Sequence, residues 1–395
     1  MSREIEQPRQ RVEALRDRAS NAPLDEEEKA QLNVLLESDD TQAEVLELAL
    51  EAYAKHIDCG GDLGADDCEA ITDLTDAQNS TVRAQVASTI GGIETSYDTR
   101  FVVDEVGDLL GDPDPKVRQE ALRALGRFRR IRSEEYSEEV TDCLEDDVPA
   151  VRAEAIRTLA NFSGRTHIED IAVCLGDPES VVKIEAIRAL DQYETVRVRE
   201  YLDSVAECLE DNPPEVRAEA LRLFGNIDPL IRYRYIDDIA DRLQDDEPQV
   251  RVDAVRAFPD TETSSHQEYL DYVADLIADP DPDPDPEVRE EAFRTLSTWV
   301  PLAIPGDRDY HQLIAQGLEG GESRVRGAAA RALGEVDRRT YRYADTLAGL
   351  LSDDETPETR KHAAFALATA ADSRGSKVAP HAAALVSVLD DDDQE

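Results

Sequence analysis

Apolar and polar residues recur along this chain in a unit of about 34 residues. Each unit opens with a Val-Arg dipeptide that follows a short acidic turn, which often contains proline. The dipeptide and its two degenerate copies begin at Val82, Val117, Val151, Val182, Val216, Val250, Val288, Val325 and Thr359. The steps between them are 35, 34, 31, 34, 34, 38, 37 and 34 residues. A period this regular predicts an array of repeats.

Each unit has the pattern of two antiparallel helices. After Val-Arg, apolar or small residues stand at offsets 0, 4, 7, 8 and 11, as in residues 117–128, which places them on one face of an α-helix. A second amphipathic segment follows, as in residues 201–209, and an Asp-rich turn then provides caps for the next helix. Such a pair cannot bury its apolar face alone, whereas stacked pairs share a core. The pattern therefore predicts an all-α solenoid.

The period also divides the chain into three segments. Residues 1–40 precede the repeats and have the pattern of an atypical helical cap, and residues 41–390 form the repeat array. Residues 391–395 are an acidic tail.

The net charge of the chain bears on which partners and which kind of cell are expected for it. The chain has 43 basic and 89 acidic residues and a formal net charge of −46, yet 41% of its residues are hydrophobic. That hydrophobic share, regularly spaced, argues against disorder. Only six of the basic residues are lysines, a balance that resembles proteins from cells with molar internal salt. Because acids outnumber bases about two to one, we do not expect nucleic acid as a partner.

The polar N-terminus lacks the features of a signal peptide, and no apolar run approaches the length of about 18 residues that crosses a membrane. The chain has five cysteines. We expect a cytoplasmic protein with reduced thiols and no membrane insertion.

Two segments carry a resemblance to a known family. They are Asp-Pro-Asp-Pro-Lys-Val-Arg-Gln-Glu-Ala-Leu-Arg-Ala-Leu-Gly at 112–126 and Glu-Ser-Arg-Val-Arg-Gly-Ala-Ala-Ala-Arg-Ala-Leu-Gly-Glu-Val at 322–336. Both resemble HEAT-like repeats of the phycobilisome-lyase type, and the composition resembles haloarchaeal proteins. The resemblance implies a right-handed α-solenoid of about nine HEAT-like two-helix repeats, in which the second helices line the concave face.

Two columns of arginine repeat with the unit. The second column has an acid three residues before it in six repeats, at Glu120, Glu154, Glu185, Glu219, Asp253 and Glu291. Acid and base at that spacing pair on a helix surface, so we interpret this column as neutralised locally rather than as a phosphate site. For the first column, the resemblance implies a structural ladder in which each arginine bonds the Asp of a neighbouring turn. These arginines are Arg118, Arg152, Arg217, Arg251, Arg289 and Arg326.

No catalytic or metal-binding pattern stands out. Cys143, Cys174 and Cys208 occupy the same place in three consecutive units, but neighbouring helices lie about 8 to 10 Å apart, which is too far for a disulfide or a shared zinc ion. None of the six histidines precedes a glutamate, whereas HEAT-like deoxyhypusine hydroxylases hold di-iron with His-Glu pairs. We expect no metal, no cofactor and no enzymatic activity.

The candidate partner-binding residues lie on the second helices and in one loop. Tyrosines begin the second helix, and acids follow two residues later: Tyr136, Tyr201, Tyr235, Tyr269 and Tyr310, then Glu138, Glu169, Asp203, Asp237 and Asp271. The tyrosines either pack between repeats or join a binding surface. The acids either solvate the protein in salt or bind a basic or amphipathic partner segment. Trp299, the only tryptophan, either contacts a partner or covers the helix ends.

These features favour a non-catalytic scaffold or adaptor for other proteins. The resemblance implies signal transduction, such as archaeal taxis, as its setting. The alternatives are a lyase-type enzyme subunit that holds a tetrapyrrole, or an assembly factor for a larger complex.

The net charge predicts that stability depends on salt. In dilute buffer the carboxylates repel one another, whereas at 1 M salt charges are screened beyond about 3 Å. We expect the helical circular dichroism signal to be lost at a lower temperature in water than in about 2 M KCl. Equal unfolding temperatures would contradict the prediction.

Overall fold

The computed structural model describes residues 2–93, 101–128, 133–162, 166–211, 213–258, 266–278, 282–299, 308–336, 339–352 and 355–389. Within these residues the chain forms helices and turns without a strand, so the prediction of an all-α solenoid is confirmed. The chain divides into two compact units, Met1–Ser204 (unit 1) and Val205–Glu395 (unit 2).

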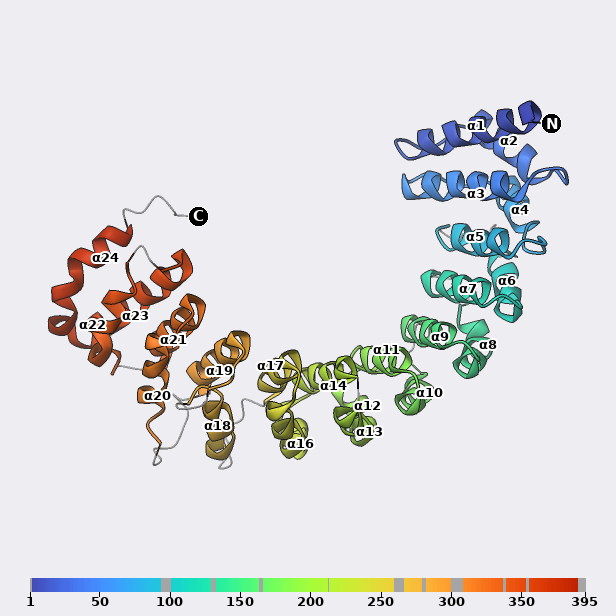
Figure 1. Ribbon diagram of the computed structural model, residues 1–395. Coiled ribbons are helices and arrows are strands. Elements are labelled where there is room, and N and C mark those ends of the chain that lie inside the picture. Colours follow the sequence, from blue (N-terminus) through green and yellow to red (C-terminus); the bar gives the residue numbers. More distant parts are fainter. Residues whose placement is uncertain are drawn as a thin grey trace. The chain divides into compact units, whose positions relative to one another are not determined.

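Unit 1 is built from helical pairs, in which a longer first helix is followed by shorter helical segments (Figure 1). Its elements are α1 (Ser2–Ala19), α2 (Glu26–Leu36), α3 (Ala43–Asp58), α4 (Ala65–Thr72), α5 (Ser80–Ile90), α6 (Phe101–Asp108), η2 (Leu109–Gly111), α7 (Pro115–Arg127), η3 (Ser133–Tyr136), α8 (Ser137–Asp142), η4 (Cys143–Glu145), α9 (Pro149–Asn161), α10 (Ile168–Val173), η5 (Cys174–Gly176), α11 (Ser180–Leu190), α12 (Thr195–Val198) and η6 (Arg199–Tyr201).

Helix α13 (Leu202–Glu207) spans the boundary, and unit 2 continues the same pairing. Its elements are η7 (Cys208–Glu210), α14 (Pro214–Asn226), α15 (Pro229–Arg232), η8 (Tyr233–Tyr235), α16 (Ile236–Asp241), η9 (Arg242–Gln244), α17 (Pro248–Ala257), α18 (His266–Asp275), α19 (Pro286–Trp299), α20 (Tyr310–Gln316), η11 (Gly317–Glu319), α21 (Ser323–Val336), η12 (Thr340–Tyr343), α22 (Ala344–Gly349), α23 (Pro357–Val378), η13 (Ala379–His381) and α24 (Ala382–Leu389).

Local sequence explains where the first helices begin. Proline occupies the first turn of α7, α9, α14 and α17, where its missing N–H costs no helical hydrogen bond. In α7 the side chain of Asp114 also caps the helix by accepting a bond from the Lys116 amide. Past this turn the apolar face is buried, with Val117, Leu122 and Leu125 fully covered. We call these first helices the long helices, and the helices that follow them the short helices.

The long helices form one layer and the short helices the other (Figure 1). In unit 1, α5 packs on α7, α7 on α9 and α9 on α11; in unit 2, α14 packs on α17, α17 on α19, α19 on α21 and α21 on α23. Among the described residues, neighbouring short helices are not in comparably close contact.

Small residues explain this asymmetry. A Cβ on Gly91 of α5 would lie 2.8 Å from the Cα of Ala124 in α7, and one on Gly334 of α21 would lie 3.1 Å from the Cα of Ala366 in α23. The long helices therefore approach closely, and within each unit the short-helix layer is the wider, convex side (Figure 1). The expectation that the second helices line the concave face is wrong, because it took no account of these small residues.

The contact at Gly91 leads to a test. The variant Gly91→Ala should lower the free energy of unfolding by about 1–3 kcal/mol, because a methyl group must enter the backbone-to-backbone contact between α5 and α7. Gly176→Ala is the matched control, since a Cβ there meets nothing within 4 Å. Chemical denaturation monitored by circular dichroism measures both, and equal stability of the two variants would contradict the packing argument.

Candidate functional site on the long-helix layer

The arginine of the Val-Arg dipeptide joins each repeat to the next. Arg118 donates from Nε and Nη2 to both carboxylate oxygens of Asp146, at 2.7 and 2.8 Å, and from Nη1 to the carbonyl oxygen of Asp112 at 2.8 Å. The same two-pronged bond forms in Arg83–Asp112, Arg118–Asp146, Arg152–Asp177, Arg217–Asp245, Arg251–Asp283 and Arg326–Glu355. Arg289 bonds Glu322 through Nη2 alone.

The accepting aspartate is part of the next turn. Besides its bonds with Arg118, Asp146 accepts a bond of 2.9 Å from the Val148 amide, just before α9. Burial acts to raise the pKa of Asp146, but the hydrogen bonds from Arg118 and Val148 outweigh it and leave the pKa lowered. The carboxylate is therefore ionised at neutral pH and fixes the turn to the preceding helix.

The second arginine column forms another row, in which four arginines each pair with two carboxylates. Arg157 pairs with Glu154 of its own helix at 2.9 Å and with Glu185 of the next long helix at 2.8 Å. Arg222 and Arg256 pair in the same way in unit 2. The arginines that have both partners are Arg123, Arg157, Arg222 and Arg256.

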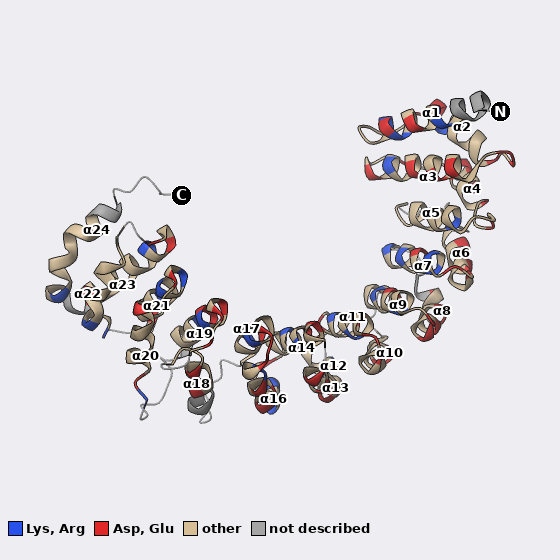
Figure 2. Ribbon diagram, viewed as in Figure 1, with Lys and Arg blue, Asp and Glu red and all other residues tan. Residues whose placement is uncertain are grey.

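In this row the guanidinium groups lie outside and the shared carboxylates inside. The Arg256 side chain is 46% exposed, while its partners Asp253 and Glu291 are 3% and 7% exposed. The surface of the long helices is therefore a line of guanidinium groups held by buried acids. Figure 2 shows the resulting division in unit 1, where basic residues gather on α7 and α9 and acidic residues on α8 and α10.

The row is interrupted in the last long helices of unit 2. Three residues after the opening Val of six repeats stands the acid of the row, from Glu120 to Glu291, but at the corresponding positions α21 has Ala328 and α23 has His362. Arg294 keeps only Glu291 of its own helix, and Arg331 bonds Glu335 instead, at 2.9 Å. The repeat pattern did not point to Ala328 or His362 as part of a site, although the missing acid before Arg331 was visible in the sequence.

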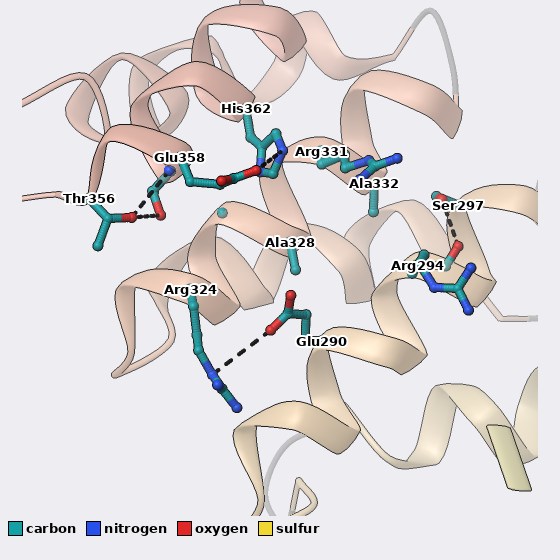
Figure 3. Close-up of a pocket in the computed structure, with 12 residues that line it drawn as sticks. Glu290, Arg294, Ser297, Arg324, Ala328, Arg331, Ala332, Thr356, Glu358 and His362 are labelled. Atoms are coloured by element: carbon teal, nitrogen blue, oxygen red, sulfur yellow. Dashed lines mark hydrogen bonds and ion pairs between the residues drawn. The ribbon is translucent and has the colours of Figure 1, made fainter. Parts of the chain in front are cut away.

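A pocket of about 160 Å³ lies where the acids are missing. Its walls come from α19, α21 and the start of α23, and Ala328 lies at its centre (Figure 3). The charged or titratable lining residues are Glu290, Arg294, Arg324, Arg331, Glu358 and His362. Three arginines thus face two glutamates, in a chain that is otherwise strongly acidic.

His362 carries a polar atom without a partner in this pocket. Its Nδ1 is buried and makes no hydrogen bond, and its Nε2 lies 3.5 Å from Glu358. Burial lowers the pKa of His362, although Glu358 acts in the opposite direction. The imidazole is therefore neutral at pH 7 and can accept or donate a hydrogen bond.

Tyrosines of the short helices bond acids of the preceding repeat. Tyr136 donates to Asp104 at 2.7 Å and Tyr310 to Asp271 at 3.0 Å. Tyr235 is buried, with its ring centroid 5.1 Å from that of Phe224, and Tyr201 is half-buried. Tyr136 and Tyr310 thus contact the preceding repeat, whereas Tyr235 packs on the long helix of its own repeat. The side chains of Tyr269 and Trp299, and the loop that follows Trp299, lie outside the described residues.

The acids of the short helices have a different environment from the buried acids of the row. Glu138, Glu169, Asp203 and Asp237 are exposed, and Asp271 is partly exposed. In the part of the chain that the structure describes, Glu138, Glu169 and Asp237 make no hydrogen bond or ion pair. We call Glu138, Glu169, Asp203, Asp237 and Asp271 the acid stripe; each unit carries its own part of it.

The structure gives no sign of a reactive role for the cysteines that it describes. Cys143, Cys174 and Cys208 are buried, and none of the five cysteines forms a disulfide. Burial raises the pKa of the Cys143 and Cys174 thiols to about 11, so both are protonated at neutral pH. Among the described residues no group of His, Cys, Asp or Glu is arranged to hold a metal ion, and no helix is long and apolar enough to cross a membrane.

Comparison with known proteins identifies the repeat. Residues 68–149 and 137–225 match the family model for HEAT repeats. Residues 68–225 are therefore similar to HEAT repeats. A search of curated protein sequences finds no match.

Solved structures share the fold. Kap95p in complex with RanGDP is 13% identical, with a TM-score of 0.68 over 92% of this chain and 54% of that chain. The karyopherin Kap121p, bound to the C-terminus of the phosphatase Cdc14p, is also 13% identical, with a TM-score of 0.61 over 93% of this chain and 44% of that chain. The chain thus spans about half the length of either karyopherin. At this identity the similarity concerns the fold.

The arginine ladder predicts a large loss of stability on truncation. In Arg118→Ala the Asp146 side chain, only 10% exposed, loses its ion partner, which should cost about 3 kcal/mol of unfolding free energy. Arg127→Ala removes an exposed arginine at the end of the same helix and should change stability by less than about 0.5 kcal/mol. Denaturant titration compares the two.

The loss of unfolding free energy in Arg118→Ala should also depend on pH. The folded-state pKa of Asp146 is lowered, so the pair contributes fully above the unfolded value of about 3.9 and loses its contribution as the pH falls through the folded value. The stability difference between wild type and Arg118→Ala should therefore shrink below about pH 4. A constant difference down to about pH 2 would contradict this role of Asp146.

Proposed function

We propose that this chain is a non-catalytic scaffold that binds other proteins. The observation that carries the proposal is the separation of charge between the two layers of each unit. Carboxylates on the long helices are buried and paired, whereas those of the acid stripe are exposed, and Glu138, Glu169 and Asp237 have no partner within the chain. In support, the fold is shared with karyopherins that were solved with bound proteins.

The partner segment is basic or amphipathic. An exposed carboxylate without an internal partner can exchange water for a cationic side chain at little desolvation cost, and an array of them accelerates encounter with a positive segment. Among the described residues, Glu138, Glu169 and Asp237 offer such carboxylates on the short helices of three repeats. An extended segment with spaced Lys or Arg residues matches this arrangement.

The resemblance of the sequence adds a finer form of the proposal. It favours a phycobilisome-lyase-type HEAT repeat in a haloarchaeal cytoplasm, with the scaffold acting in signal transduction such as taxis. The alternatives of a tetrapyrrole-holding lyase subunit or an assembly factor have no particular feature of the described residues in their favour. A purified protein that absorbs visible light through a bound tetrapyrrole would replace the scaffold proposal.

Neutralising the acid stripe tests the proposal. The double variant Glu138→Gln/Glu169→Gln should bind a fluorescein-labelled hexalysine peptide about fivefold more weakly than wild type, because two exposed ion pairs of about 0.5 kcal/mol each are lost. Fluorescence anisotropy measures the affinity, and circular dichroism checks the fold.

The matched control is Glu139→Gln/Asp142→Asn. It makes the same change of charge at exposed residues of α8 outside the stripe. Its affinity for hexalysine should remain within about twofold of wild type. If both double variants weaken binding equally, the peptide responds to net charge alone and the acid stripe is no docking site.

A further inference from the structure

The pocket around Ala328 is defined by what the other repeats have in its place. In six of those repeats a Glu or Asp side chain occupies the position, and it can pair with the arginine of its own helix and with that of the preceding long helix, as Glu154 does with Arg157 and Arg123. Alanine ends at Cβ, so the corresponding position between Arg294 and Arg331 has no carboxylate.

The two arginines beside the gap retain unused bonding capacity. Among the described residues, Arg294 and Arg331 each have one carboxylate partner, whereas Arg123, Arg157, Arg222 and Arg256 have two. Their side chains are 57% and 51% exposed. A guanidinium group offers five N–H donors in a planar fork that suits a carboxylate, so both can accept a second partner from outside.

We propose that this pocket binds the carboxylate of an acidic side chain in an extended segment of a partner protein, which takes the place of the missing glutamate of the repeat. The inference rests on the proposed scaffold function and adds a second docking point, on the layer opposite to the acid stripe. The partner carboxylate bonds Arg294 and Arg331, with Arg324 at the edge of the pocket and His362 as a further polar contact (Figure 3).

Charge and size favour a carboxylate over a phosphate group. Glu290 and Glu358 also line the pocket, and Glu291 and Glu335 pair with Arg294 and Arg331, so a ligand with a single negative charge is repelled less than one with two. A phosphate that carries nearly two negative charges would be repelled by these glutamates. The volume of about 160 Å³ suits the end of one acidic side chain.

A first experiment examines the pocket without any partner. Ala328→Glu restores the side chain of the regular repeats, and if the geometry is that of a carboxylate site, the variant should unfold at a temperature a few degrees higher than wild type. Ala382→Glu makes the same substitution at the exposed first residue of α24, where the acid gains only the small stabilisation of the helix dipole, and should raise it less. A lower unfolding temperature for Ala328→Glu than for Ala382→Glu would show that the pocket cannot hold a carboxylate, and would overturn the proposal.

The second experiment measures binding by the full chain. Fluorescein-labelled hexaglutamate is the probe and hexaglutamine the control, in KCl that keeps the helical signal intact. Hexaglutamate should bind wild type and the Ala382→Glu variant alike. Binding should be weakened at least about tenfold by Ala328→Glu, which fills the pocket, and by Arg331→Gln, which removes one guanidinium group.

The outcomes separate the possible ligands. Equal binding to wild type and Ala328→Glu, or no binding at all, overturns the proposal. If inorganic phosphate displaces the peptide at a lower concentration than acetate does, the pocket binds small anions instead. The proposal that an acidic partner segment occupies it would then be wrong. Failure of the scaffold proposal would appear with hexalysine and the acid-stripe variants, and therefore remains distinguishable from a failure here.

Discussion

The bond between the Val-Arg arginine and the aspartate of the next turn is the constraint on which the rest of the structure depends. It satisfies a buried carboxylate, orders the turn that caps the following helix and fixes the distance between repeats. Apolar burial supplies much of the favourable free energy in any such array, but it does not specify register. The charge-assisted bonds do, because both oxygens of the aspartate and two nitrogens of the arginine must meet in one plane.

This constraint also organises charge. The acids of the row on the long helices are buried beneath guanidinium groups. The surplus negative charge of the chain therefore lies on the short helices and the turns. The two layers of a unit thereby acquire different surfaces from the same repeat. A single substitution in the row, Ala328 for an acid, is enough to turn a saturated seam into an open pocket.

The spacing of apolar residues along the sequence was enough to predict the helical pairs. The three-residue spacing of acid and arginine was enough to predict the bond between them within one helix. The bond to the next repeat, as from Arg157 to Glu185, was not predictable, because it depends on how closely two long helices approach. The expectation that the second helices line the concave face was wrong for the same reason, because it too depends on how closely the long helices approach. For the tyrosines, sequence left packing and binding open, since the choice rests on the position of Asp104 or Asp271 in the preceding repeat.

The bond from the arginine to the carboxylate of the next turn connects only neighbours, and its two-pronged form recurs at six seams, whereas Lys183 stands at one seam and Arg289 bonds Glu322 through Nη2 at another. The aspartate that closes one seam lies in the turn from which the next arginine extends. A repeat flanked by two-pronged seams, such as residues 117–150, can therefore be removed or duplicated with the arginine before it still meeting an aspartate in the same geometry. The length of the array is thus free to change in steps of one repeat, while the surfaces that flank each seam are inherited unchanged.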